Sequence, residues 1–237
     1  MFTISNASNP IISLIVWSTI LHGSGNSLPM SQNQIFSYFI ILIFVNIATS
    51  AWGGLFVSQD IRLGNISKLL LKPTSVFYEQ LGNNISEKIF KLIYLIPVIV
   101  VVYYFYPFSV SLNLVPLFVV SLLISASMGF LVDLIITASA FWLDDNGAVF
   151  QLFDIPMFFF SGIIIPLAVM PELVRNFTYY LPFRYFISFP IEVLTGALTN
   201  QEMWTGFLIQ LIWFAVVIFG YKLSWKMGFR VYSASGA

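Results

Sequence analysis

The chain contains no cysteine and only one histidine, His22, among its 237 residues. Without cysteine it forms no disulfide framework and no thiolate metal site. A lone histidine supplies no His-x-x-x-His zinc motif, and its place at the end of an apolar run favours an interfacial role. No glycine is followed by lysine, so the phosphate-binding loop that cradles ATP is also missing. We therefore expect no enzymatic activity, no metal and no cofactor in this chain.

Charge is scarce as well. Charged residues make up 8% of the chain and hydrophobic residues 59%, with a mean hydropathy of +0.91, whereas a soluble domain carries roughly 25% charged residues. The apolar runs are longer than the roughly ten alternating residues of a barrel strand. Lipid requires the backbone to satisfy its own hydrogen bonds, which helices do. The sequence therefore predicts an all-α, polytopic integral membrane protein that forms one domain, residues 1–237.

Six apolar segments are long enough to be transmembrane helices, for which about 20 residues are needed. The first is diluted by polar residues at its start and has no basic residues before it, so a signal peptide is not expected. The predicted spans are residues 4–22, 35–57, 90–106, 114–138, 147–165 and 204–222.

The basic residues are distributed unequally between the two sets of loops. Two of them, Arg175 and Arg184, fall between the fifth and sixth spans. Cytoplasmic loops are enriched in lysine and arginine, so both termini and the 58–89 loop are expected in the cytosol and the 166–203 segment outside. The other set of loops, on the expected cytosolic side, contains eight basic residues: Arg62, Lys68, Lys72, Lys88, Lys91, Lys222, Lys226 and Arg230.

The 58–89 loop contains an amphipathic pattern. Over residues 61–71, Ile66, Leu69 and Leu70 share one helical face, and the proline in Lys72-Pro73 is expected to end the helix. A second helix should begin near Thr74 or Ser75 and lead into the third span. The first helix either lies on anionic lipid or seats in a groove of a soluble partner.

The 158–196 segment is rich in aromatic residues and interrupted by glycine and proline. Gly162, Pro166, Pro171 and Pro182 break helical hydrogen bonding. Two structures fit this pattern. One is a pair of short re-entrant helices that cap a transport route, and the other is an ordinary external loop held at the interface by tyrosines.

Two aspartates fall within predicted spans, where a charge is costly. Asp133 follows Ser121, Ser125 and Gly129 at four-residue steps, a small-residue run that suits close helix packing. On the fifth span Gln151, Asp154, Phe158 and Ser161 share one face. Each aspartate either lies on the cytosolic side, makes a structural hydrogen bond to a serine, threonine or tyrosine, or lines a translocation route.

Two of these patterns, on opposite membrane faces, resemble the ABC type-2 permeases, the membrane subunits of ATP-binding-cassette exporters. The resemblance extends from about Trp17 to Tyr221 and includes the Phe141-Trp142 pair. It departs from the family pattern at the start, where the amphipathic helix that usually precedes the first span is missing or unusually short. The cytosolic residues that carry it are Ile61, Arg62, Gly64, Leu69, Leu70, Leu71, Lys72 and Pro73, with Lys68 between them. The external ones are Phe160, Ser161, Gly162, Pro166, Pro171, Leu181, Pro182, Phe183, Phe189 and Pro190.

This resemblance implies a permease of the cell membrane, the inner membrane in a two-membrane cell, that works as a dimer with a second copy or a related permease. Cytosolic ATPase subunits would hold ATP and magnesium and contact the 62–73 segment. The segment from Gly162 to Pro190 would gate export of an amphipathic or lipid-like substrate. No nucleic-acid partner is expected. An ion- or proton-coupled secondary carrier is the main alternative, although no inverted repeat is visible; a membrane-embedded enzyme or an assembly scaffold is a further one.

Overall fold

The computed structural model describes residues 30–51, 53–67, 75–105 and 110–232, together with Ile12, Val16, Trp17 and Thr19. Every regular element in this part of the chain is a helix, which confirms the all-α prediction. Most of the first predicted span, residues 4–22, lies outside the described residues. Of that segment, Ile12, Val16, Trp17 and Thr19 are helical.

The second predicted span, residues 35–57, is two helices rather than one. Helix α2, Gln32–Thr49, begins with a capping box in which Ser31 and Gln34 satisfy each other's backbone N–H groups. The backbone is extended at Ser50, and α3, Gly54–Arg62, begins four residues later. A break inside an apolar segment leaves the first N–H groups of the new helix without helical partners.

Helix α5, Val76–Phe105, is continuous over 30 residues and retains Pro97 in its interior. Its start matches the helix expected after Ser75. The helix expected after Ser75 and the third predicted span, residues 90–106, therefore form one continuous helix.

Helices α6 and α10 are the long apolar helices of the structure. Two 3-10 turns, η2 (Leu112–Leu114) and η3 (Ser139–Phe141), extend α6, Val115–Ala138, at its two ends. Helix α10, Asn200–Val231, begins with a capping box between Thr199 and Glu202. They contain the predicted spans 114–138 and 204–222.

Helix α7, Gly147–Phe160, has only 14 residues, five fewer than the predicted span 147–165. At 1.5 Å per residue it is about 21 Å long, shorter than the roughly 30 Å hydrocarbon core. Short elements then follow to the start of α10. They are η4 (Leu167–Val169), α8 (Glu172–Thr178), η5 (Pro182–Phe186) and α9 (Ser188–Thr195).

Three helical segments of the described chain are long and apolar enough to cross a membrane: Asn33–Arg62, Leu112–Phe141 and Asn200–Val231. The first comprises α2 and α3 on either side of their break. The structure thus supports a multi-pass helical protein, and the count of six spans stays a prediction.

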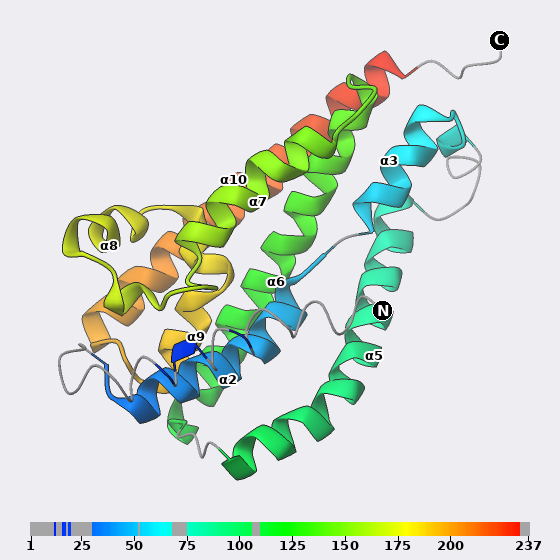
Figure 1. The fold of residues 1–237 in the computed structure, drawn as a ribbon. Helices are drawn as coiled ribbons and strands as arrows, with labels where there is room; N and C mark the ends of the chain where they lie inside the picture. Colours follow the sequence, from blue (N-terminus) through cyan, green and yellow to red (C-terminus); the bar gives the residue numbers. More distant parts are fainter. Residues whose placement is uncertain are drawn as a thin grey trace.

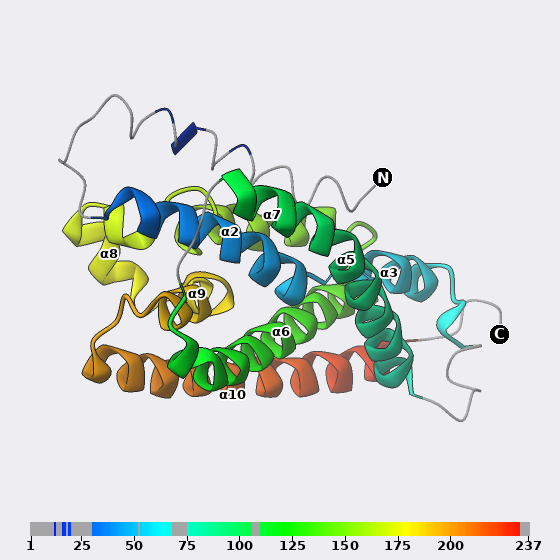
Figure 2. The same cartoon turned by 90° about the horizontal axis from the view of Figure 1, so that it is seen from below.

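Helix α6 lies at the centre and contacts α2, α3, α9 and α10. Figure 1 shows α6 running beside α10, with α8 and α9 gathered at one end and α3 at the other. Figure 2 shows α10, α6 and α2 as successive layers, with α5 crossing at the α3 end. The small-residue face of α6 is indeed an interface, because Ser125 Oγ receives a 3.0 Å hydrogen bond from Gln210 of α10.

Close helix packing at the centre depends on Gly129. A Cβ atom at this position of α6 would overlap the backbone carbonyl oxygen of Thr49 at the end of α2. Because a backbone atom cannot rotate away, any side chain here must push α2 and α6 apart.

We expect Gly129→Ala to lower the stability of the detergent-solubilised protein by about 1–3 kcal/mol, the usual cost of overpacking. Gly82→Ala in α5 is the matched control, since a Cβ there meets nothing within 4 Å and alanine favours a helix. Thermal unfolding of the two variants beside the parent measures the difference. Equal melting temperatures for both variants would contradict the close approach of α2 and α6.

Candidate functional site

The helix expected over residues 61–71 is interrupted. Helix α3 ends at Arg62, and Gly64 has a φ of 73°, in the left-handed region where glycine is unstrained. Helical residues resume at Ile66 and Ser67. The sequence pattern was misleading because the apolar spacing continues across the glycine. The remaining candidate coupling residues, Lys68, Leu69, Leu70, Lys72 and Pro73, lie outside the described residues.

Two other parts of the chain hold the Arg62–Ser67 turn. Arg62 donates a 2.5 Å hydrogen bond from Nη1 to the carbonyl of Asp144, in the loop before α7. Tyr232, directly after α10, donates its hydroxyl to the carbonyl of Gly64 at 3.0 Å and lies 2.8 Å from Ser67 Oγ. Sequence patterns gave no signal for Asp144 or Tyr232 because these partners are 82 and 168 residues away.

The Phe141-Trp142 pair lies in the same region. The Phe141 ring makes edge contacts with Trp142, Trp225 and Tyr232, at centroid distances of 5.8–6.0 Å. A Cβ at Gly228 would overlap this ring, so the glycine lets η3 approach α10. The pair thus joins the end of α6 to the end of α10.

Asp133 of α6 holds the start of α3. Its Oδ2 accepts a 2.9 Å hydrogen bond from the Gly54 N–H, and the side chain is buried with 7% exposure. A carboxylate at a helix N-terminus pairs with an orphan N–H and with the positive end of the helix dipole. Glycine is required at position 54, because a Cβ there would overlap Thr137 Oγ1 and lie 2.9 Å from the Asp133 carboxylate. A structural hydrogen bond was among the roles expected for Asp133, but to a serine, threonine or tyrosine; the observed donor is the backbone N–H of Gly54.

The other route candidates lie on α7, a different helix from that of Asp133. Gln151, Asp154 and Phe158 are exposed, whereas Ser161, at the end of that face, is fully buried. No residue of α7 is buried within the described structure, and among the described elements its main contact is η5. No described element of the chain therefore covers the polar face of α7.

The predicted breaks of the external segment are where the sequence placed them. Gly162 has a φ of 89°, and a Cβ on it would overlap the Tyr38 hydroxyl, which donates a 2.9 Å hydrogen bond to the Gly162 carbonyl. Pro166, Pro171 and Pro182 stand at the starts of η4, α8 and η5. Two candidates of this segment, Leu181 and Pro190, fall at the N-cap of η5 and inside α9.

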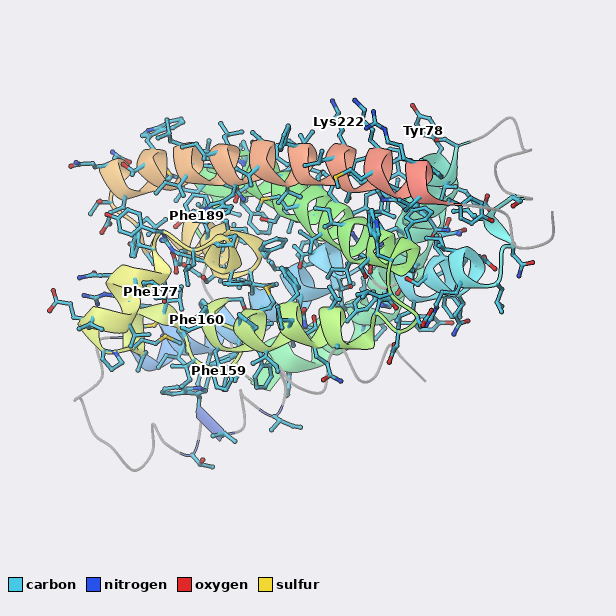
Figure 3. The ribbon with its side chains drawn as sticks, turned by 90° about the horizontal axis from the view of Figure 1, so that it is seen from above. Tyr78, Phe159, Phe160, Phe177, Phe189 and Lys222 are labelled. Atoms are coloured by element: carbon cyan, nitrogen blue, oxygen red, sulfur yellow. The ribbon has the colours of Figure 1, made fainter. Side chains whose placement is uncertain are left out.

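Aromatic rings join α7 to the external segment. Phe160, the last residue of α7, contacts Phe177 of α8 at 6.2 Å and Phe183 of η5 at 6.4 Å between ring centroids. Figure 3 shows Phe160 and Phe177 side by side at this end, with Phe189 lying deeper between α9 and α10. The short elements η4, α8, η5 and α9 therefore pack together, and we call them the cap.

A buried ion pair that the sequence did not reveal holds this cap. Arg184 of η5 is 1% exposed and donates from Nη2 to Glu192 of α9 at 2.5 Å, while its guanidinium lies 3.7 Å from the Tyr179 ring centroid. Burial acts to lower the pKa of Arg184, but the nearby Glu192 carboxylate outweighs it and holds the pKa above the ordinary value. Arg184 is therefore a permanent cation inside the cap.

The cap is also hollowed on its surface. A cavity of about 630 Å³ lies among α8, α9 and α10, and Arg175, Glu192, Glu202, Tyr179 and Tyr180 contribute to its lining. Among the described residues, no group of three or more histidine, cysteine, aspartate or glutamate side chains is arranged to hold a metal ion.

Long apolar helices, a small-residue helix interface and a compact cap at one end define a helical multi-pass membrane protein. A family model described as ABC-2 family transporter protein matches residues 7–236. The chain therefore belongs to the ABC-2 family of transporter proteins and is a permease-type membrane protein. No curated protein shows significant similarity to it.

We expect Glu192→Gln to destabilise the protein by about 3–5 kcal/mol, because the substitution leaves the buried Arg184 charge without its anion. Glu172→Gln on α8 is the matched control, since Glu172 is exposed and surface changes stay within about 0.5 kcal/mol. The free energy of unfolding of both variants in detergent measures the difference. A Glu192→Gln protein as stable as the control would show that the ion pair does not hold the cap.

Proposed function

We propose that this chain is the transmembrane subunit of an ATP-driven exporter that moves an amphipathic or lipid-like substrate out of the cytoplasm. The observation that carries the proposal is the linkage at Arg62 and Gly64. There the chain that leads into the expected ATPase contact is bonded to the α6–α7 loop and to the end of α10. Family membership supports the transporter class.

The hydrogen bonds give a route for coupling. A partner that displaced the 62–73 segment would pull on Asp144 through Arg62 and on α10 through Tyr232. The same force would reach α6, because Asp133 holds the other end of α3. ATP and magnesium would bind the partner ATPase, and coupling requires that ATP bind one arrangement better than the other.

A second permease copy, or a related one, would cover α7. Gln151 and Asp154 are exposed on a helix whose other residues are mostly apolar. Facing lipid, an aspartate at the helix centre costs about 2.5–3.5 kcal/mol. Against a second copy, the same face would line a polar route between the two subunits, with Phe158 at its outer end.

The segment from Ser161 to Pro190, which makes up most of the cap, would be the outer gate of that route. Its short helices sit directly on the end of α7 through the Phe160 contacts. A shift of α7 toward or away from a second copy would therefore move the cap. Non-helical backbone such as that around Gly162 is tolerated at membrane depth only where protein or water covers it.

The proposed topology places the cap outside and both chain ends in the cytosol. Because the chain has no cysteine, single cysteines at exposed sites report their side unambiguously. We expect Asn176→Cys on α8 to react with an impermeant maleimide in intact cells. Ser86→Cys on α5 should react only after the membrane is permeabilised. The reverse pattern would overturn the topology and the assignment of the outer gate.

The ATPase contact is tested by changing the apolar residues of the 62–73 segment. We expect the double substitution Leu69→Asp and Leu70→Asp to leave the chain inserted but to release the ATPase or uncouple its activity from export. Apolar side chains in a groove dominate such contacts. Lys68→Ala is the control and should have a smaller effect, because charges at the rim of an interface contribute less.

Co-purification and ATPase activity measured in the presence and absence of the permease give the readout. A coupled ATPase retained by the double variant would place the contact elsewhere. Transport by the parent chain without any nucleotide-hydrolysing partner would replace the exporter proposal with an ion- or proton-coupled carrier.

A further inference from the structure

A second cavity, of about 420 Å³, lies at the opposite end from the cap. Helices α3, α5 and α6 form its walls. Four carboxylates contribute to the lining: Asp60 of α3, Glu79 and Glu87 of α5, and Asp133 of α6. Most of the other lining residues are the amides Gln80, Asn83 and Asn84 of α5 and the aromatic residues Phe56 and Phe130.

The charged side chains among these lining residues are all acidic. The described residues that line the cavity include no lysine and no arginine. Lys91, one turn beyond Glu87 on α5, forms an ion pair with it and offsets one of the four charges. Asp60 and Asp133 add two further carboxylates, so negative charge predominates among the described lining residues, and a cation is the ligand that this field favours.

Asp133 adds a second and independent observation. Its side chain is more than nine-tenths buried, and Oδ2 is used by the Gly54 N–H. The other oxygen, Oδ1, is also buried and accepts no hydrogen bond within the described structure. A buried polar atom is nearly always satisfied, so an unpartnered carboxylate oxygen in a cavity wall points to a ligand that donates to it.

The geometry favours an organic cation over a metal ion. No three acidic or histidine side chains of the described residues converge as metal ligands would. The volume lies within the roughly 300–1,000 Å³ range of small-molecule pockets. The Phe56 and Phe130 rings offer apolar and cation–π contact to the body of such a ligand.

We propose that this cavity binds an organic ammonium ion, with the positive nitrogen beside Asp133 and the apolar body against the rings of Phe56 and Phe130. In an exporter, this cavity would be the place where cargo is loaded from the cytosol, and that part of the proposal rests on the proposed export function. Binding itself does not, because it needs only this chain.

The probe is benzylammonium, a cation with N–H donors at neutral pH, titrated by calorimetry into the full-length chain in nanodiscs of zwitterionic lipid. We expect saturable binding that Asp133→Asn weakens roughly tenfold or more, as loss of a charged partner usually does. Asparagine keeps an acceptor for the Gly54 N–H, so the fold should be retained. Asp60→Asn, on the less buried wall of the cavity, should weaken binding similarly without touching that bond, whereas Glu172→Gln on the cap should leave it unchanged.

Benzyl alcohol, sodium chloride and magnesium chloride are the comparison ligands. No binding of the probe, equal binding by all variants, or equal binding of benzyl alcohol would overturn the proposal. Magnesium or sodium binding that depends on Asp133 while the probe does not bind would replace the organic cation with an inorganic one. Because no ATPase takes part, these outcomes are independent of whether the exporter proposal holds.

Discussion

The hydrogen bond from the Gly54 N–H to Asp133 is the interaction on which the α3 end of the molecule depends. The α2–α3 break leaves helix N–H groups orphaned in apolar surroundings, where each unpaired group is costly. A carboxylate from α6 meets this need and at the same time fixes where α3 starts. Arg62, at the other end of α3, is thereby placed beside the loop before α7, and one wall of the acidic cavity is set.

The two ends of the molecule are held by different kinds of interaction. At the cap, breaking the buried Arg184–Glu192 ion pair is costly, because each separated charge would be left uncompensated. At the α3 end, hydrogen bonds from Arg62 and Tyr232 go to backbone carbonyls near the surface. Such bonds exchange with water at a small net cost of about 0.5–1.5 kcal/mol each. The α3 end is thus the easier one for a partner to rearrange.

Local sequence chemistry predicted part of this fold well. The all-helical class and the two long helices α6 and α10 follow from apolar length, and the breaks at Gly162, Pro166, Pro171 and Pro182 follow from backbone geometry. The α2–α3 break was missed, although Gly53-Gly54 was a signal for it, because the apolar run continues across the pair. The partners of Asp133 and Arg184 were not predictable, since packing rather than sequence spacing brings them together.

Helix α3 connects the two proposed sites physically. Its nine residues extend about 13 Å. One face, through Asp60, lines the acidic cavity, and its end, at Arg62, enters the segment assigned to the ATPase contact. A ligand that ties α3 to α5 and α6 biases the position of the same element that the ATPase would displace. Binding free energies coupled through one element are reciprocal, so a cation that favours the ATP-bound arrangement would itself bind more tightly when ATP is present.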